Sequence, residues 1–312
     1  MKLSIVTTLY SSAAYVAEFY ERISRAASAL TGEYELLFVN DGSPDDSLER
    51  VRELYERDRR VRIIDLSRNF GHHKAMMTGL SHVRGDRVFL IDVDLEEQPE
   101  WLTEFAAVMA RTEADVVYAV QQRRKGRLWD RLTGALFYRA FNALLDYSIP
   151  ENVTTARLMS RRFVDSLVQH REREMTIAGL WALTGYRQVP VEVDKRRRGG
   201  TTYDFGRRVA VFVNGVTSFS SRPLVYVFYL GSAMMVMSAA FGAVLIWKAM
   251  NGEIGVPCWP TLIVSIWFLG GVTIFCLGLI GIYLSKVFIE AKARPYTIVR
   301  ATYDHQQETA EP

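Results

Sequence analysis

Residues 87–94 read RVFLIDVD, an apolar run that ends in two aspartates. A short apolar run bounded by polar turns is typical of a strand buried on both faces of an α/β sheet. Asp92 and Asp94 are two residues apart, so an extended chain directs both carboxylates to the same side. Open α/β sheets bind ligands at the carboxyl ends of their strands, and we therefore expect this run to carry the two carboxylates into a functional site.

Similar short apolar segments occur throughout the first 120 residues, where they alternate with helical segments. This alternation predicts a parallel α/β sheet. The expected strands are Leu3–Leu9, Glu35–Val39, Val61–Leu66, Arg87–Asp92 and Val116–Val120. The expected helices are Ala14–Leu30, Ser47–Arg57, Lys74–Val83 and Pro99–Arg111. Further strands are expected over Thr155–Met159 and Gln188–Val193, and further helices over Arg161–His170 and Arg173–Leu183. These segments define a domain expected over residues 1–222.

Two long uncharged stretches follow this domain. Leu224–Trp247 has 24 residues and Pro260–Ser285 has 26, and at about 1.5 Å per residue either helix would cross a hydrocarbon core of about 30 Å. Both lie too far from the N-terminus to be signal peptides. In a chain of 312 residues that is 49% hydrophobic, they argue against a purely soluble enzyme, a secreted protein and a disordered chain. We expect two transmembrane helices within residues 223–288.

Basic residues flank these stretches, although the formal net charge is only +3. The flanking residues are Lys195, Arg196, Arg197, Arg198, Arg207, Arg208, Arg222, Lys286, Lys292 and Arg294. The link between the stretches carries only Lys248 and Glu253. The positive-inside rule then predicts a multi-pass protein of the inner (plasma) membrane, with both flanks cytoplasmic and the link outside; a solvated basic face unrelated to topology is the alternative. Residues 289–312 are expected to be a cytoplasmic tail, disordered after Tyr303.

An amphipathic helix is predicted over Arg127–Tyr147, where apolar side chains fall on one helical face. Such a helix lies in the membrane interface or packs on the sheet. Arg123, Arg127 and Arg131 precede the helix or lie on it. The planar guanidinium suits bidentate phosphate contacts, so these arginines are candidates to bind a phosphate at the membrane surface. Anchoring to anionic lipid headgroups is the alternative.

Asp92 and Asp94 form a candidate metal site. Two clustered carboxylates without a cation repel each other, and one of them would become protonated. With Mg²⁺ or Mn²⁺ they are hard oxygen ligands that can also hold a diphosphate. An acidic turn after a strand is the alternative. His72 and His73 are adjacent too, and without further ligands they are expected to start a helix rather than to bind metal.

Five short motifs occur in order along the chain. They are Asp41-Gly42-Ser43, Ser67-Arg68-Asn69-Phe70-Gly71, Asp92-Val93-Asp94, Ser160-Arg161-Arg162 and Ser218-Phe219-Ser220 before Pro223. As a set, they resemble the polyisoprenyl-phosphate glycosyltransferases of glycosyltransferase family 2. That group includes dolichyl-phosphate mannose synthases and bacterial undecaprenyl-phosphate glucosyl and aminoarabinosyl transferases. The likeness covers nearly the whole chain, with both apolar stretches.

The resemblance implies a GT-A, Rossmann-like α/β catalytic domain on the cytoplasmic side of the membrane. It implies an inverting, metal-dependent transfer of one sugar from a nucleotide diphosphate sugar, expected to be UDP-linked, to undecaprenyl phosphate, for cell-envelope glycan modification. The acceptor phosphate is already an anionic nucleophile, so no Ser, Cys or His has to be activated. The implied partners are membrane lipids and further copies of the chain, as in the tetramers of relatives, without nucleic acid.

Carried over by position, the resemblance assigns Asp41 to the nucleotide base. The remaining residues assigned to the nucleotide sugar are Thr7, Thr8, Tyr10, Arg68 and Asp92. Considered without the resemblance, Tyr10 is equally a core-packing residue, and Asp41 is a turn former before Gly42.

The resemblance also assigns the groups around the reacting phosphates. Asp92 and Asp94 would hold the diphosphate through the metal, with Glu96 as a further ligand where relatives commonly have Gln. Asp94 would be catalytic, together with Arg123 and Arg131. The residues that would meet the acceptor phosphate are Arg123, Arg127, Arg131 and Arg157.

The chain departs from the family pattern at three places, one of which is the pair His72 and His73, where the residues of relatives vary. Relatives often have Asn-Glu where Ser11 and Ser12 stand, which alters part of the nucleotide pocket. Many have Gly-Asp-Phe-Arg where this chain has Thr154-Thr155-Ala156-Arg157. Thr155 therefore removes one candidate base beside the sugar, and the sequence does not name the sugar.

Two other functions are compatible with parts of the sequence. A processive polysaccharide synthase would share the catalytic core, but it would carry more spans and a Gln-x-x-Arg-Trp motif, which Gln121-Gln122-Arg123-Arg124 does not match. A non-catalytic membrane scaffold that binds nucleotide sugars or lipids would keep the fold without needing Asp94.

Overall fold

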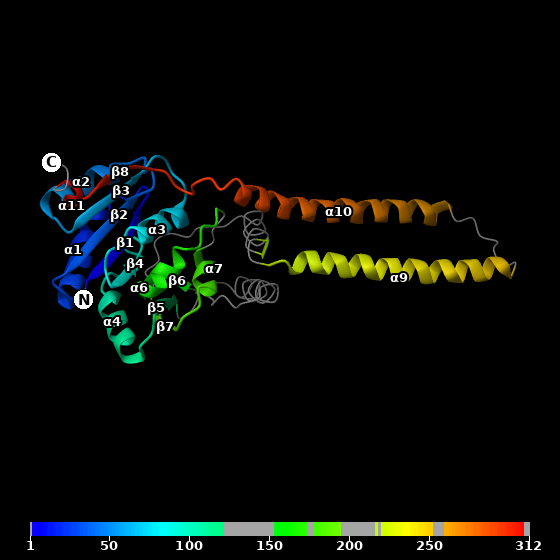
Figure 1. Ribbon diagram of the computed structural model, residues 1–312, viewed down its shortest axis with the longest axis horizontal. Coiled ribbons are helices and arrows are strands. Elements are labelled where there is room, and N and C mark those ends of the chain that lie inside the picture. The colour runs from blue at the N-terminus through cyan, green and yellow to red at the C-terminus, as the bar shows by residue number, and fades with distance from the viewer. Residues whose placement is uncertain are drawn as a thin grey trace. The chain divides into compact units, whose positions relative to one another are not determined.

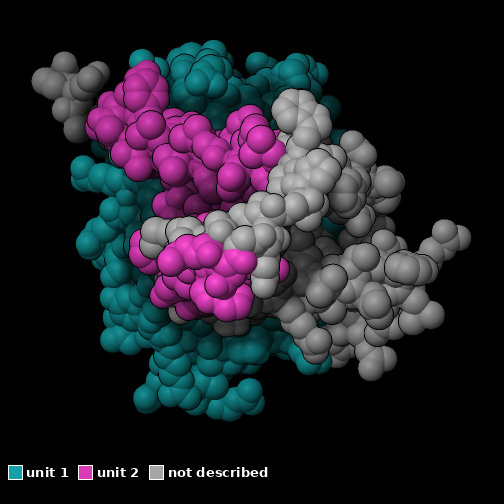
Figure 2. Space-filling view, turned by 90° about the vertical axis from the view of Figure 1, so that its right-hand side faces the viewer, with its two compact units in different colours: residues 1–138, 147–203, 294–312 teal, residues 139–146, 204–293 magenta. Residues whose placement is uncertain are grey.

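A computed structural model describes residues 2–121, 153–173, 177–194, 216–217, 220–251 and 259–308 of the chain (Figure 1). The chain divides into two compact units, which Figure 2 colours separately. The first unit contains the described residues 2–121, 153–173, 177–194 and 294–308. The second contains the described residues 216–217, 220–251 and 259–293. The predicted amphipathic helix over Arg127–Tyr147 lies outside the described residues.

An eight-stranded mixed sheet forms the centre of the first unit, in the order β7-β5-β6-β4-β1-β2-β3-β8. Its strands are β1 (Leu3–Leu9), β2 (Tyr34–Asn40), β3 (Val61–Leu66), β4 (Arg87–Leu90), β5 (Val116–Gln121), β6 (Val153–Ser160), β7 (Gln188–Val193) and β8 (Val299–Tyr303). β1 is parallel to its neighbours β2 and β4, whereas β6 is antiparallel to β4 and β5, and β8 to β3. The expected α/β fold is confirmed, although the sheet is mixed rather than wholly parallel.

Helices cover both faces of this sheet. On one face, α1 (Val16–Leu30), α2 (Ser47–Arg57) and α4 (Trp101–Thr112) share an apolar core with alternate residues of the strands. On the other face lie α3 (His72–Ser81) and α6 (Arg161–Leu167), which contact each other and the strands. A further helix, α7 (Ile177–Leu183), precedes β7. This two-layer cover buries β1, β2 and β3 completely, as expected for strands that read as continuous apolar runs.

The strand that carries the aspartates is shorter than predicted. β4 ends at Leu90, and residues 93–97 form turns and bends. Leu95 has a φ of 61°, a left-handed conformation that is costly for a branched side chain. The two aspartates therefore lie in a turn immediately after the strand rather than within it.

Two long apolar helices make up most of the second unit: α9 (Arg222–Met250) and α10 (Trp259–Ala291). Candidate membrane spans run over Arg222–Val244 and Ser265–Ala291, by length and composition. The hydroxyl of Tyr283 on α10 donates to the carbonyl of Ser220, just before α9, at 2.6 Å. The prediction of two long apolar C-terminal helices is confirmed.

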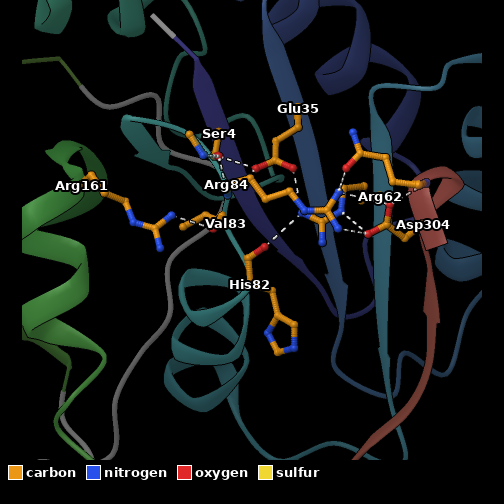
Figure 3. Close-up of polar contacts among 10 residues, drawn as sticks. Ser4, Glu35, Arg62, His82, Val83, Arg84, Arg161 and Asp304 are labelled. Atoms are coloured by element: carbon orange, nitrogen blue, oxygen red, sulfur yellow. Dashed lines mark hydrogen bonds and ion pairs between the residues drawn. The ribbon is translucent and has the colours of Figure 1, made fainter. Parts of the chain in front are cut away.

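After the second unit, the chain returns to the sheet. β8 pairs with β3, and α11 (His305–Glu308) follows it, so the expectation of disorder after Tyr303 is wrong for these four residues. Figure 3 shows how the segment is fixed: Asp304 is 2% exposed and accepts hydrogen bonds from Arg62 at 3.0 Å and Arg84 at 2.6 Å. Arg62 also donates to Glu35 of β2 at 2.7 Å. The buried charges of Glu35, Arg62 and Asp304 are thus paired with one another, as buried charges must be.

Candidate functional site

The carboxyl ends of β1, β2 and β4 meet at one edge of the sheet, because β1 lies between its two parallel neighbours. The predicted nucleotide residues Thr7 and Thr8 lie near the end of β1, Asp41 follows β2, and Asp92 follows β4. Strand order therefore brings together side chains that are up to 85 positions apart in the sequence. This edge is where α/β sheets of this type bind ligands.

Asp41 joins two loops at this edge. Its carboxylate is 2% exposed and accepts the backbone N–H groups of Phe70 at 2.7 Å and Gly71 at 3.0 Å. Burial raises the pKa of Asp41 above its ordinary value, against the lowering effect of these two hydrogen bonds. Gly42 follows with a φ of 59°, and a Cβ there would lie 2.5 Å from the backbone of Arg68. Only glycine allows the two loops to pack this closely.

The threonines at the end of β1 differ in their environment. Thr7 is 2% exposed, and its hydroxyl has no hydrogen-bond partner among the described residues. Thr8 Oγ1 lies 3.0 Å from Nδ1 of His72. Tyr10 is 53% exposed, so it is not the core-packing residue that its type alone allowed. Thr7, Thr8 and Tyr10 thus border the edge to which Asp41 and Asp92 belong.

His72 connects the β1 end with the aspartate turn. Its Nε2 lies 3.3 Å from Oδ1 of Asp92, while Nδ1 faces Thr8. Burial opposes the charged imidazolium, but the hydrogen bond to Asp92 and the charges of Asp92, Asp41 and Glu97 outweigh it, so the pKa of His72 is raised. The expectation that His72 starts a helix is confirmed, since α3 begins there. The contact of His72 with Asp92 could not be predicted from the sequence, because that contact depends on strand order.

Asp92, Asp94 and Glu96 alternate with buried residues along the turn, and each is half-buried. Asp94 Oδ1 accepts the backbone N–H of Glu96 at 2.9 Å. Within the part of the chain that the structure describes, no three His, Cys, Asp or Glu side chains are grouped to hold a metal ion. Carboxylate oxygens nevertheless fit Mg²⁺ or Mn²⁺, because such ions are commonly held by one or two carboxylates together with substrate phosphates rather than by a cage of protein ligands.

A buried polar cluster lies beside the aspartate turn and was not predicted as a cluster, although it contains Arg157, which was predicted to meet the acceptor phosphate. Glu97 is fully buried, and its Oε1 accepts the backbone N–H of Thr155 at 2.9 Å. Arg157, 1% exposed on β6, donates to the carbonyls of Thr154 and Thr155 and lies over the ring of Trp181. Burial lowers the pKa of Arg157, and the charge of Glu97 opposes this effect. These contacts support the β6 backbone next to the site.

Comparisons with known proteins identify the family of this chain. Residues 4–168 match the family model described as glycosyl transferase family 2. The chain belongs to glycosyl transferase family 2. A Mycobacterium tuberculosis protein named among the glycosyltransferases is 52% identical over 312 residues, which is 100% of this chain and 91% of the relative. A prophage bactoprenol glucosyl transferase homologue of Escherichia coli is 32% identical over 304 residues, covering 96% of this chain and 99% of the relative. The bactoprenol glucosyl transferase of Shigella phage SfV is also 32% identical, covering 96% and 98%.

The remaining predicted residues of this family 2 glycosyltransferase divide into two groups. Arg68 is exposed, its guanidinium lies 4.1 Å from the ring centre of Phe70, and it donates to the carbonyl of Asn69 at 2.9 Å. It therefore borders the loop that Asp41 holds. Arg123, Arg127 and Arg131 lie outside the described residues of the glycosyltransferase.

Proposed function

We propose that this glycosyltransferase moves one sugar from a UDP-linked sugar to undecaprenyl phosphate, with inversion, at the cytoplasmic face of the membrane. The observation that carries the proposal is the meeting of Asp41 and Asp92 at one sheet edge in a chain that also has two long apolar helices. Relatives that align over nearly the whole chain are named bactoprenol glucosyl transferases, which supports a lipid phosphate as acceptor. The lipid-linked sugar would serve cell-envelope glycan modification.

On the donor side, the edge residues bind and orient the nucleotide. Asp41, Thr7, Thr8, Tyr10 and Arg68 border the space proposed for the base and ribose. Thr7 supports this assignment, because a buried hydroxyl without a partner among the described residues is available to a ligand.

The diphosphate is proposed to lie beside the aspartate turn. Asp92 and Asp94, with Glu96 nearby, would hold the divalent cation, Mg²⁺ or Mn²⁺, whose chemistry is charge neutralisation on the leaving diphosphate. His72 fixes the Asp92 carboxylate from the side of β1, because the imidazole contacts both Asp92 and Thr8.

On the acceptor side, a lipid phosphate oxygen attacks the anomeric carbon from the face opposite the nucleotide. The bond from that carbon to the donor diphosphate breaks, UDP leaves with the electron pair, and a carbon–oxygen bond to the acceptor phosphate forms. Because the nucleophile is already anionic, no protein base has to remove a proton. Arg123, Arg127 and Arg131 are proposed to hold this phosphate. Arg157 would have to leave its buried position to join them.

The proposal is tested with purified full-length protein in vesicles that contain undecaprenyl phosphate. A set of nucleotide sugars is supplied one at a time. The lipids are then separated by thin-layer chromatography, and the mass of the product is determined by mass spectrometry. A single sugar on the lipid phosphate is expected with a UDP-linked donor. A polymer would identify a processive synthase instead, and the absence of product with every donor would favour a non-catalytic scaffold.

A further inference from the structure

The strand β8 brings a charged side chain from the end of the chain to the proposed donor edge. It begins eight residues after α10 ends, and it pairs antiparallel with β3, placing Ala301 opposite Asp65. The carbonyl of Ile298 accepts the backbone N–H of Ser67 at 2.9 Å, which extends the pairing to the carboxyl end of β3. Arg300 therefore lies beside the last residues of β3.

Arg300 is the first member of a series of hydrogen-bonded residues that continues through Asp65 and Asn40. Its Nε donates to Oδ2 of Asp65 at 2.7 Å, and its second guanidinium nitrogen lies 2.7 Å from the same oxygen. The other carboxylate oxygen of Asp65 accepts Nδ2 of Asn40, at the end of β2, at 2.8 Å. Asp65 and Asn40 are each 2% exposed, so the bond between them is shielded from water, whereas the side chain of Arg300 is 56% exposed.

Asn40 also bonds to the loop over residues 40–43, which carries Asp41. Its Oδ1 accepts the backbone N–H of Ser43 at 3.1 Å. Ser43 Oγ in turn accepts the backbone N–H of Ser11 at 2.7 Å and donates to Asp45 at 2.6 Å. The series thus ends at the loop that carries Asp41 and at the residue after Tyr10.

The direction of the series follows from hydrogen-bonding chemistry. An ionised carboxylate only accepts, so Asp65 takes the NH₂ group of Asn40 and leaves the amide oxygen facing Ser43. Aspartate at position 40 would set two acceptors against each other, and an apolar residue would satisfy neither partner. Arg300 supplies the countercharge that a buried carboxylate needs.

We propose that Arg300, Asp65 and Asn40 are positioning residues for the donor, and that the strand after the second apolar helix thereby fixes the loop over residues 40–43. The inference rests on the proposed function, because it assumes that the nucleotide binds at this loop. A purely structural role would lower stability without separating donor binding from acceptor binding. The test therefore compares the two substrates.

The variants are made in the full-length protein. Arg300→Gln removes the countercharge from an exposed side chain and leaves the folded core intact, and Arg300→Lys keeps the charge. Asn40→Asp reverses the polarity toward Asp65. Arg60→Gln is the matched control, because Arg60 makes a comparable exposed ion pair with Asp58 at 2.8 Å near the other end of β3.

UDP affinity is measured by calorimetry, and KM for each substrate by the transfer assay. Arg300→Gln is expected to weaken UDP binding and raise the donor KM about three- to tenfold, in keeping with loss of a charge-assisted bond. Asn40→Asp should weaken UDP binding and raise the donor KM by about tenfold or more. Arg300→Lys should recover part of the UDP affinity that Arg300→Gln loses. The acceptor KM stays within twofold of the wild-type value, and Arg60→Gln changes neither constant.

Hydrogen exchange over residues 40–47 provides a readout that needs no ligand. Faster exchange there in Arg300→Gln than in Arg60→Gln is expected. Wild-type exchange together with unchanged UDP affinity in Arg300→Gln would overturn the inference, as would an equal rise in both KM values. If the wild-type protein neither binds UDP nor turns over any donor, the proposed function fails, and the exchange rates alone then decide whether Arg300 orders the loop.

Discussion

Asp94 lies in the turn after β4 and is held by the backbone, because its Oδ1 accepts the N–H of Glu96 at 2.9 Å. That bond orients the carboxylate without neutralising it. Asp94 and the neighbouring Asp92 are both anionic, so they can lie close to an anionic diphosphate only when a cation is bound between them. Asp94 is therefore expected to contribute to the rate of sugar transfer rather than to the stability of the fold.

Asp94→Ala is expected to abolish transfer while the protein stays folded. Loss of a metal ligand leaves diphosphate charge uncompensated, which costs several kcal/mol in the transition state and reduces kcat by about 100-fold or more. EDTA should remove wild-type activity, and Mg²⁺ or Mn²⁺ should restore it. Asp165→Ala serves as control, since within the described part of the chain Asp165 forms only an exposed ion pair with Arg161. Normal turnover of Asp94→Ala, or of the wild type in chelator, contradicts the metal-dependent mechanism.

Arg131→Ala is expected to impair use of the lipid acceptor. If Arg131 holds the acceptor phosphate, loss of a charge-assisted hydrogen bond should raise KM for undecaprenyl phosphate or lower kcat by about 10- to 100-fold. UDP affinity, measured by calorimetry, should stay near the wild-type value. Arg131→Lys should recover only part of the loss, because it keeps the charge but not the planar fork. Unchanged kinetics in a variant lacking both Arg123 and Arg131 would leave them as headgroup anchors.

Among the elements, the loop before α2 depends on one carboxylate. Burial opposes the charge of Asp45, but hydrogen bonds from Ser43, Ser47 and the backbone N–H of Ala13 outweigh it and lower the pKa of Asp45 to about 2. A folded-state pKa below the unfolded value of about 3.9 gives stability that is present above about pH 3.9 and is lost as the pH falls through about 2.

Asp45→Asn should therefore lower the melting temperature at pH 6, and its difference from the wild type should narrow as the pH falls below about 4. Asp46→Asn is the neighbouring control, because Asp46 makes no side-chain hydrogen bond to the start of α2. Thermal unfolding of the detergent-solubilised protein at several pH values gives both differences. A gap between the wild type and Asp45→Asn that is constant from pH 6 to pH 2.5 would show that the ionised carboxylate does not hold the loop.

The contact of α3 with the sheet depends on the absence of a side chain at position 79. A Cβ on Gly79 would lie 2.5 Å from Val6 Cγ1 and 2.9 Å from Val39 Cγ2. Gly79→Ala should destabilise the protein by about 1–3 kcal/mol through overpacking, although alanine is the better helix former. Gly32→Ala is the control, because a Cβ there would meet none of the described residues within 4 Å. Chemical denaturation measures both, and a stability gain in Gly79→Ala would mean that α3 moves away from the sheet at little cost.

For the whole molecule, the asymmetry of basic residues predicts that both ends of the chain are cytoplasmic and that the link near Asn251 is outside. In a chain with Cys258 and Cys276 replaced by Ser, single cysteines are introduced at Asn251 and Gln306. An impermeant thiol reagent applied to intact cells should label the first position and spare the second until the cells are lysed. The reverse pattern would invert the topology.

The first unit is built from both ends of the sequence, since Arg62 of β3 bonds with Asp304 and Arg300 of β8 with Asp65. A truncation after α10 would therefore expose the edge of β3 and leave Arg62 with one fewer partner. The segment after the apolar helices is thus part of the proposed catalytic domain rather than an appended tail.

Periodic patterns determined most of the architecture. The bounds of β1, β3, β7 and α2 agree with the prediction, because continuous apolar runs and helical spacing are local properties of the sequence. The two apolar helices were predicted for the same reason. The motifs around Asp41 and Asp92 indicated the family, which the relatives confirm.

Tertiary structure alone decided what lies beside those motifs. β8 reads VRATY, five residues within the segment that was expected to be a tail, and its partner strand β3 lies more than 230 residues earlier. His72 meets Asp92, and Glu97 meets Thr155, only because strand order places their loops together. Hydrophobic periodicity records which side of an element is buried, whereas a hydrogen bond depends on which residue lies opposite, and that is settled only when distant strands pair.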